Sequence, residues 1–269
     1  MKKPFALLIT DTHLHDGNID LVKDIFKQAK EYCIKNNIKY IFHLGDWFTS
    51  RKSQSQAVLL ATKDIIYSFY NIAKMNIIKG NHDAVEADSE DSFLDVFDDF
   101  NNFSVSKKET QINFGDLCIN MIPYFKESGS YLSRLENITN FPVCIKHKIL
   151  LTHVAVNGVR NNDGSVIENT LPGDIFKQYD YVYVGHYHNQ SKIGNNIYYI
   201  GSAYASNFGE NNEKGFTLLY NDGSHEFIKS KFKEYIKVSL DITDEESIKK
   251  AKKQYANSPD NVRFVFQGD

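Results

Sequence analysis

Short apolar runs alternate with longer helical patterns through the first third of the chain. The apolar runs are too brief for helices and predict buried strands at residues 5–10, 38–44 and 75–78. Between them the apolar side chains recur with a helical period, which predicts helices at residues 19–35 and 54–70, the first with Asn18 as its N-cap. A strand–helix–strand–helix–strand order needs crossover connections, so it favours a largely parallel sheet.

The second half of the chain is richer in strands and tight turns. Strand-like runs lie at residues 111–114, 117–122, 148–152, 181–185, 197–200, 216–220 and 226–230. Hairpin-type turn signals separate several of them, for example Gly115-Asp116 and Asn221-Asp222-Gly223. We therefore predict an α/β fold of two stacked mixed β-sheets flanked by helices, over residues 1–231. The Lys-rich, amphipathic stretch of residues 232–269 is expected to begin a separate small element.

The composition narrows the class of protein. A chain of 269 residues with 42% apolar and 24% charged residues has the mixture of an ordinary globular domain, which excludes disorder as its dominant state. No window approaches ~18 uninterrupted apolar residues, so we expect no membrane span. The net charge of −3 gives no overall basic field. Cys33, Cys118 and Cys144 are widely spaced and outside CxxC pairs, so we expect reduced cysteines and a cytoplasmic protein.

Polar residues gather directly after five of the predicted strands. They are Asp11, His13, Asp46, Asn81, His82, Asp83, His153, His186 and His188. Ligand sites of open α/β sheets lie beyond the carboxyl ends of the strands, so these side chains are expected at one edge of the molecule. Each piece alone is common by chance, since a turn Asp, a surface His or a helix cap would explain it. Five pieces in order, each at a strand end, favour one site over those separate explanations.

The residue types are those of a metal site. Neutral imidazole and carboxylate suit zinc, manganese or iron, and thiolates are absent from these loops. Asp46 is the carboxylate placed to be shared, and a bridging carboxylate holds together two cations that repel each other at ~3.5–4 Å. Asn81 offers a neutral oxygen, which leaves its cation more Lewis acidic. We therefore expect two divalent metal ions.

The motifs Asp11-x-His13, Gly45-Asp46, Gly80-Asn81-His82-Asp83, His153 and Gly185-His186-x-His188 resemble the motif series of the calcineurin-like metallophosphoesterases. The resemblance runs from residue 1 to about residue 230. It implies one metal site made by Asp11, His13, Asp46 and His188, and another made by Asp46, Asn81, His153 and His186. It also implies that His82 is the catalytic residue, which protonates a leaving oxygen. Asp83 could orient His82 or cap the next helix, and we favour the cap.

The sequences of several loops narrow the resemblance to one branch of this family. Residues 48–52, 182–188, 199–203, 207–210 and 214–216 are similar to those of SbcD-type DNA-repair nucleases, in particular the nuclease subunit that tailed phages use in recombination and DNA processing. The resemblance implies a DNA exonuclease or endonuclease that uses Mn²⁺, with Mg²⁺, Fe²⁺ or Zn²⁺ as alternatives. It further implies a homodimer that pairs through residues 54–70 and 92–100, although an apolar stripe of this kind is more often core than interface. It also implies an SbcC-type SMC-like ATPase partner in a bacterial cytoplasm. In such relatives a cap domain follows the core, so residues 232–269 would be the start of a cap, in a trimmed chain or a reduced relative.

Several residues near the motifs depart from the family or have two explanations. Thr49 stands where many relatives carry His or Asp, so no added acid or ligand is expected there. His15 stands where relatives often carry Gly, and we expect it to face solvent. His43 lies inside a predicted strand and is expected in the core or behind the ligands. Arg51 and Lys52 follow the second motif closely, where they could grip phosphates beside the scissile bond or form a solvated loop, with about equal weight.

Two other functions share much of this pattern. A metallophosphoesterase acting on small phosphodiesters or phosphomonoesters would use the same ligands. Only the loop sequences favour DNA as the substrate. A non-catalytic scaffold on the same fold, such as the retromer subunit, is disfavoured because the ligand set and His82 are complete. Metal content and hydrolysis of a generic phosphodiester would separate an enzyme from a scaffold. Defined DNA substrates would separate a nuclease from a small-molecule esterase.

Overall fold

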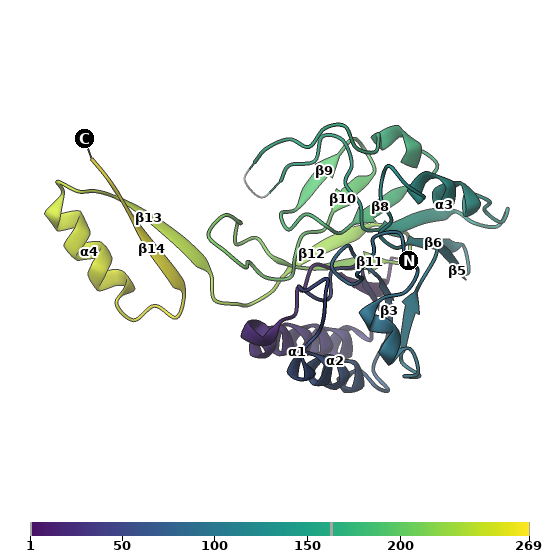
Figure 1. The fold of residues 1–269 in the computed structure, drawn as a ribbon, viewed down its shortest axis with the longest axis horizontal. Helices are drawn as coiled ribbons and strands as arrows, with labels where there is room; N and C mark the ends of the chain where they lie inside the picture. Colours follow the sequence, from purple (N-terminus) through teal and green to yellow (C-terminus); the bar gives the residue numbers. More distant parts are fainter. Residues whose placement is uncertain (1, 162–163, 269) are drawn as a thin grey trace.

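The predicted strands lie in two six-stranded sheets that stack face to face between helices (Figure 1). The structure is a computed structural model that describes residues 2–161 and 164–268. Helices α1 (Ile19–Asn36) and α2 (Gln56–Ser68) pack on the outer face of the first sheet, and α3 (Tyr131–Asn137) packs on the outer face of the second. The predicted α/β fold of two stacked mixed sheets is confirmed.

The first sheet has the strand order β12-β11-β1-β2-β3-β4. Its strands are β1 (Pro4–Ile9), β2 (Tyr40–His43), β3 (Lys74–Ile78), β4 (Phe103–Ser106), β11 (Gly215–Tyr220) and β12 (His225–Lys229). Strands β1 to β4 are parallel, as crossover connections require, whereas β11 pairs antiparallel with β1. The hairpin β11–β12 comes from the strand-rich second half of the chain, yet it extends the first sheet rather than the second.

The second sheet has the strand order β5-β6-β7-β8-β10-β9. Its strands are β5 (Thr110–Phe114), β6 (Leu117–Ile122), β7 (His147–Thr152), β8 (Tyr181–Val184), β9 (Ser191–Ile193) and β10 (Ile197–Tyr199). The pairs β5–β6 and β9–β10 are antiparallel, and the first of them turns at the predicted Gly115-Asp116. Strands β6, β7, β8 and β10 are parallel. Strands β4 and β9 are additions that the apolar pattern does not predict.

The central strands of both sheets are buried on both faces, because their alternating side chains fill different layers. In β1, Leu8 lies in the core between the two sheets, whereas Leu7 packs with the residues of α1 and α2. In β7, Leu151 lies in the core between the sheets, whereas Leu150 packs with the residues of α3. Burial on both faces explains why these strands read as continuous apolar runs rather than as alternating ones.

The helices begin and end close to their predicted positions, and Asn18 is the N-cap residue of α1 as predicted. Asn18 occupies the N-cap position of α1 without a capping hydrogen bond from its side chain. Its amide instead donates to the His13 carbonyl oxygen at 2.9 Å and to the Tyr204 hydroxyl at 2.8 Å. Short 3-10 helices lie at η1 (Asp16–Asn18), η2 (Phe93–Phe97) and η3 (Gly173–Phe176). Among the described residues, none of the helices combines the length and the apolar content that a bilayer span requires.

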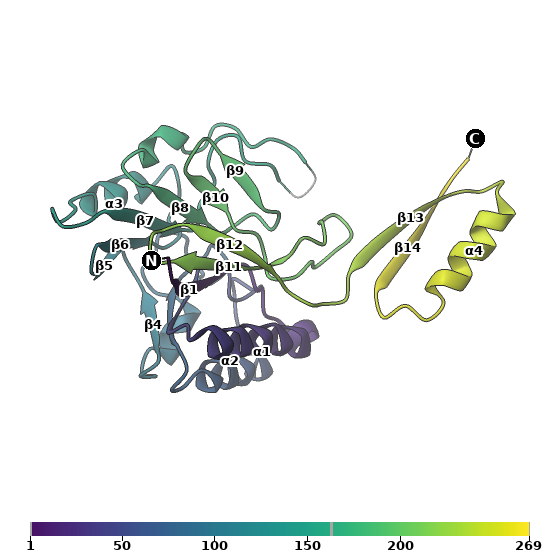
Figure 2. The same cartoon turned by 180° about the vertical axis from the view of Figure 1, so that it is seen from behind.

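Residues 232–268 project from the body as a small unit, which we call the C-terminal element (Figures 1 and 2). It consists of the parallel strands β13 (Tyr235–Asp241) and β14 (Asn261–Gln267), joined by helix α4 (Glu245–Tyr255). The side chain of Asn212, in the body, bonds both the backbone N–H and the carbonyl oxygen of Tyr235 at 3.0 Å. The division at residues 231 and 232 and the cap role stay predictions, and the outer ends of the two predicted ranges, residues 1 and 269, lie outside the described residues.

His43, at the end of β2, is a core histidine. It is almost fully buried, and its ring lies 5.0 Å from the ring of Trp47 and 6.4 Å from that of Phe26, measured between ring centroids. Burial, with the nearby His153 adding to it, lowers the pKa of His43 to about 3. The folded protein therefore keeps this imidazole neutral over a pH range in which the unfolded chain would bind a proton.

Acidification should destabilise the protein through His43. Between its unfolded pKa, near 6.5, and its folded pKa, about 3, only the unfolded state binds this proton, so the free energy of unfolding falls as the pH falls. His43→Gln should reduce the slope of that free energy against pH by about 1.4 kcal/mol per pH unit. Urea unfolding at several pH values in EDTA measures the slope for both proteins. Equal slopes would show that His43 is not neutral in the folded state.

Candidate metal centre

Five loops meet at one edge of the two stacked sheets. They follow β1, β2 and β3 of the first sheet and β7 and β8 of the second, each at the carboxyl end of its strand. The loops carry the predicted site residues Asp11, His13, Asp46, Asn81, His82, His153, His186 and His188. Parallel neighbours end at the same edge of a sheet, and stacking of the sheets brings the two edges together. Asp11, Asp46 and His153 are almost fully buried there.

Four of these residues have a left-handed backbone. The φ angles are 52° at Asp11, 42° at His13, 55° at Asp46 and 87° at His186. Residues other than glycine rarely adopt this conformation, and it costs about 1–3 kcal/mol each. Such a concentration of strain within one site indicates that the loops are shaped to aim side chains rather than to minimise their own energy.

Gly45 and Gly80 allow two of the loops to touch. A Cβ at Gly45 would lie 2.8 Å from the Gly80 Cα, and a Cβ at Gly80 would lie 2.2 Å from the Asp46 backbone nitrogen. Both separations are too short for any side chain. The glycine that precedes the acidic or amide residue in each motif therefore lets Asp46 and Asn81 approach each other.

The first group of donors comprises Asp11, His13, Asp46 and His188. The Nε2 atoms of His13 and His188 are 3.0 Å apart. The His13 Nε2 lies 3.8 Å from Asp11 Oδ1 and 3.6 Å from Asp46 Oδ2. Asp11 is held in place by the backbone N–H of His186, which donates to its carboxylate at 3.0 and 3.2 Å.

The second group of donors comprises Asp46, Asn81, His153 and His186. Asn81 Oδ1 lies 3.0 Å from His153 Nε2 and 2.8 Å from His186 Nδ1. His153 Nε2 lies 3.4 Å from Asp46 Oδ2, the same oxygen that faces the first group. The structure thus brings together all seven predicted ligands in the two predicted groups, with one carboxylate oxygen between them.

The spacing of these atoms fits a coordination shell. Ligands at about 2.1 Å from one ion lie about 3.0–3.4 Å from each other in octahedral and tetrahedral geometry. Most of the donor separations within each group fall close to that range. His153 Nδ1 donates to the Leu44 carbonyl at 2.7 Å, and His188 Nδ1 is bonded to Glu210 at 3.0 Å. Because Nδ1 of each ring is engaged, the Nε2 lone pair can face the centre, as a metal ligand requires.

A family model described as "Calcineurin-like phosphoesterase" matches residues 6–190. The chain belongs to the calcineurin-like phosphoesterase family. The "DNA double-strand break repair protein Mre11" of Methanocaldococcus jannaschii is 27% identical over 189 residues, which cover 67% of this chain and 50% of that protein. The protein of the same name from Sulfurisphaera tokodaii is 26% identical over 200 residues, which cover 70% of this chain and 50% of that protein. The chain spans about half the length of these curated relatives.

Among solved structures, the crystal structure of Pseudomonas putida nuclease MPE is similar, with 15% identity and a TM-score of 0.35 over 68% of this chain and 61% of that chain. The family match makes this calcineurin-like phosphoesterase a hydrolase of phosphoesters, and the family uses divalent metal ions. The Asp and His clusters described above are possible sites for them. The resemblance to SbcD-type nucleases is supported by the two Mre11 relatives.

Charge compensation links the buried groups of the phosphoesterase site. Burial opposes ionisation of Asp46, but the charge and hydrogen bond of His153, with His13, lower the pKa of Asp46 well below its usual range. Burial likewise opposes a charge on His153, and Asp46 outweighs it and raises the pKa of His153 to about 9. Burial and the neighbouring His153 lower the pKa of His186 to about 4. A proton on His153 thus compensates Asp46, and a bound cation would take over that role.

His82 adjoins the first donor group, and one of its ring nitrogens lies within 4.8 Å of donor atoms of His13 and Asp46. Its Nδ1 is 2.7 Å from the Thr49 carbonyl oxygen, and its backbone N–H donates to Asp46 Oδ1 at 2.8 Å. Its ring meets the ring of His13 edge-on at 5.0 Å. The Arg51 guanidinium is 3.3 Å from the His82 Nε2, and Lys52 is exposed beside it. The Thr49 carbonyl therefore leaves Nε2 as the atom that faces outward.

Four functional neighbours were missed or misjudged from sequence. Thr49, where no ligand was expected, donates its hydroxyl to the His13 carbonyl at 2.6 Å besides holding His82. Asp83 was expected to cap a helix, but it accepts from the backbone N–H of Phe48 at 2.9 Å and of Gly80 at 2.7 Å. Glu210 and Lys214 lie behind His188 as a buried ion pair. In the sequence, Glu210 and Lys214 are noted only as part of loops that resemble SbcD-type nucleases, and no role is predicted for either.

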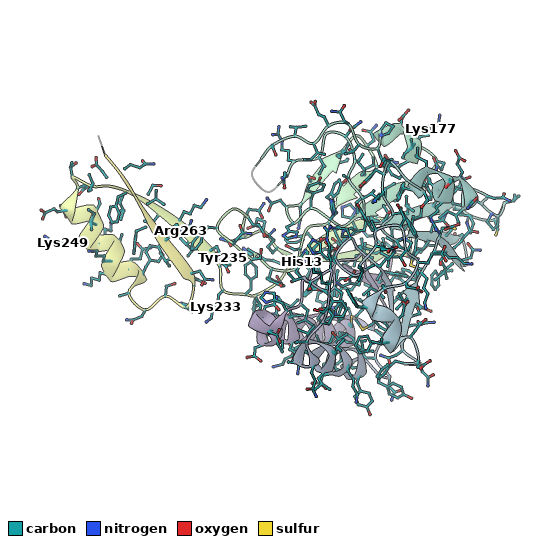
Figure 3. The ribbon with its side chains drawn as sticks, viewed as in Figure 1. His13, Lys177, Lys233, Tyr235, Lys249 and Arg263 are labelled. Carbon is teal, nitrogen blue, oxygen red and sulfur yellow. The ribbon has the colours of Figure 1, made fainter. Side chains whose placement is uncertain are left out.

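A cavity of about 1260 Å³ opens above the donor atoms. Its floor includes His13, Asp46, Asn81, His82, His186 and His188. Its walls include Asp16, Asp20 and Asp24 near the start of α1, and Lys231, Lys233 and Tyr235 where the chain enters the C-terminal element. Lys233 and Tyr235 lie at the junction with the body, on the side toward His13, whereas Lys249 lies far from it on α4 (Figure 3). His15, expected to face solvent, is exposed and also lines this cavity.

Gly80→Ala should disrupt the site through backbone overlap. The added Cβ would lie 2.2 Å from the Asp46 backbone nitrogen, so the Asp46 and Asn81 loops must separate. We expect a loss of about 3 kcal/mol or more in the free energy of unfolding, together with loss of metal binding. Urea unfolding and Mn²⁺ titration measure the two effects. Gly129→Ala is the matched control, because the atoms nearest to its Cβ would be side-chain atoms, the Asp88 carboxylate oxygens at 3.1 Å and the Lys126 Cβ at 3.2 Å. Wild-type metal binding in Gly80→Ala would contradict the proposed contact.

Proposed function

We propose that this phosphoesterase is a two-metal-dependent DNA nuclease. The observation that carries the proposal is the position of Asp46 Oδ2, which lies between the two donor groups, 3.6 Å from His13 Nε2 and 3.4 Å from His153 Nε2. One ion would be held by Asp11, His13, Asp46 and His188. The other would be held by Asp46, Asn81, His153 and His186. The mixture of imidazole and oxygen donors suits Mn²⁺, with Mg²⁺, Fe²⁺ or Zn²⁺ as alternatives.

The bound ions would supply Lewis-acid charge on a phosphodiester and lower the pKa of water beside it. The chain's own residues would do the rest. Asp46, buried and fixed through the His82 backbone N–H, sets the separation of the two donor groups. His82 Nδ1 donates to the Thr49 carbonyl, so Nε2 is the acceptor that faces the Arg51 guanidinium at 3.3 Å. Once Nε2 takes up a proton and Arg51 moves to a phosphate, His82 can give that proton to the departing sugar oxygen. The Thr49 carbonyl keeps the ring oriented through Nδ1.

Three features support DNA as the substrate. The two Mre11 relatives are named as DNA double-strand break repair proteins. The cavity of about 1260 Å³ exceeds the roughly 300–1,000 Å³ that is usual for small-molecule pockets. Arg51 lies against the proposed catalytic histidine, His82, where it can move onto a phosphate next to the scissile bond. Lys52, the next residue, is exposed, and Lys231 and Lys233 line the cavity.

We further propose a homodimer and an SbcC-type ATPase partner, as the sequence resemblance implies. Leu60 and Tyr67 on α2, Tyr70 just after it, and Val96 on η2 are exposed apolar side chains within the segments expected to pair. Burial of such side chains is a common source of association free energy. Residues 232–269 would act as the start of a cap over the cavity. The cytoplasmic, phage-related setting stays a prediction.

The proposal is tested with the purified protein, Mn²⁺ and labelled duplex, hairpin and single-stranded DNA. We expect cleavage of at least one DNA substrate, and a loss of about 10³-fold or more in Asp46→Ala, because that variant removes the shared ligand. Bis-p-nitrophenyl phosphate and p-nitrophenyl phosphate serve as small diester and monoester probes. Hydrolysis of the small esters without any cleavage of DNA would support the alternative function. Metal binding without any hydrolysis would indicate a scaffold.

His82→Asn should separate metal binding from turnover. His82 belongs to neither ligand set, so the variant should bind two Mn²⁺ ions as the wild type does. Loss of the proton donor should lower the rate of DNA cleavage by about 10²–10⁴-fold. Metal titration and single-turnover cleavage give the two quantities. A variant that cleaves DNA at the parental rate would show that His82 does not have the assigned role.

A further inference from the structure

We infer that Glu210 is a positioning residue that holds His188 in the orientation needed to bind its metal ion. The inference rests on the proposed function, because it assumes that His188 is a ligand. It adds a residue outside the two ligand sets, from the loop between β10 and β11, 22 residues beyond His188 in the chain. The argument starts from the contacts that this buried carboxylate makes.

Glu210 Oε1 is the acceptor at which three side chains meet. His188 Nδ1 lies 3.0 Å from it, the Ser206 hydroxyl donates to it at 2.6 Å, and the Asn207 amide donates to it at 3.0 Å. The residue is only 6% exposed. A carboxylate oxygen cannot donate, so the proton of this contact must come from His188 Nδ1. The neutral His188 ring then has its lone pair on Nε2, the atom that faces His13 Nε2 at 3.0 Å.

Lys214 keeps the carboxylate charged and in place. Its Nζ lies 2.8 Å from Glu210 Oε2, and neither side chain has any exposed surface. The same ammonium donates to the carbonyl oxygen of His188 and, at 3.1 Å, to Asn189 Oδ1. The pair therefore fixes both the ring and the backbone of His188. A buried ion pair with no exposed surface is weak support for stability alone, which leaves room for a positioning role.

His153, another of the proposed ligand histidines, is held differently. His153 Nδ1 donates to a neutral acceptor, the Leu44 carbonyl, which belongs to the strand framework. A carboxylate partner orients an imidazole and also raises its basicity, so the ion on the His188 side should bind more tightly than it would with a neutral partner. Glu210 should thus affect one metal site and leave the other unchanged.

The loop that carries Glu210 is also the platform on which the C-terminal element rests. The Phe208 ring meets the Tyr235 ring edge-on at 5.0 Å, and the Arg263 guanidinium lies 4.1 Å from the Phe208 ring centroid. Tyr235 and Arg263 are both on the strands of the C-terminal element, on its side toward the body (Figure 3). The position of Glu210 is therefore restrained from outside as well as by its own hydrogen bonds.

A titration of the protein with Mn²⁺, monitored by electron paramagnetic resonance, tests the inference in the absence of substrate. The wild type should bind two ions. Glu210→Gln should weaken one of them by about 10–100-fold and leave the other within about two-fold. Glu213→Gln is the matched control, since Glu213 is an exposed carboxylate of the same loop that pairs with Lys229. It should bind both ions as the wild type does.

A double-mutant cycle with His188→Gln separates positioning from a general structural effect. If Glu210 acts through His188, Glu210→Gln should change the Mn²⁺ affinity by less than about two-fold in the His188→Gln background. An undiminished effect there, or two wild-type sites in Glu210→Gln, would overturn the inference while leaving the proposed function intact. Failure of the wild type to bind a pair of ions would overturn the proposed function instead, and the inference with it.

Glu210→Gln leaves Lys214 buried without its counter-ion, so the variant could unfold. Glu210→Gln with Lys214→Met removes both charges at nearly constant volume and keeps the experiment decisive. Thermal unfolding in EDTA checks that each variant is folded at the temperature of the titration. A folded double variant that binds two Mn²⁺ ions with wild-type affinity would equally contradict the inference.

Discussion

Negative charge buried where the five loops meet is the constraint on which the rest of the site depends. Asp11, Asp46 and Asp83 are each at most 2% exposed, and an unpaired buried carboxylate is costly. Each is compensated differently. Asp11 accepts from the His186 backbone N–H, Asp46 pairs with histidines, and Asp83 accepts from the N–H groups of two separate loops. The loops therefore fold around the carboxylates, and the histidines take their positions from that arrangement.

Asp83 shows how strongly this arrangement couples the loops. Burial and the nearby Asp46 raise the pKa of Asp83 to about 7, although two N–H groups favour its charged form. Its bond to Phe48 fixes the loop after β2, and its bond to Gly80 fixes the loop after β3. These are the loops whose glycines touch. A change of charge on Asp46, whether by a proton or by a cation, is thus felt at Asp83 without any new contact.

The gathering of the candidate site residues could be predicted from the sequence because each follows an apolar strand, and strand direction brings such residues to one edge. Their division into two ligand sets is what the family resemblance implies. What could not be read depends on partners far apart in the chain. Asp83 lies 35 residues from Phe48, and Glu210 lies 22 residues from His188. Asn18 is of a residue type that caps helices, yet its side-chain amide donates to the Tyr204 hydroxyl and the His13 carbonyl oxygen. The local sequence of the β11–β12 hairpin is compatible with either sheet. The hairpin belongs to the first sheet because β11 pairs with β1.

On the proposed function, bound metal ions would also change the charge of the cavity that a DNA backbone meets. Asp16, Asp20 and Asp24 line its walls, and Asp46 lies in its floor, so the cation-free surface includes carboxylates that repel a phosphate backbone. Lys231 and Lys233 attract phosphate only from the side of the C-terminal element. Two divalent cations would add four positive charges at the floor and would reverse the sign of the local charge. On the proposed function each ligand would then favour binding of the other, so metal affinity and DNA affinity would be linked by the same coupling free energy.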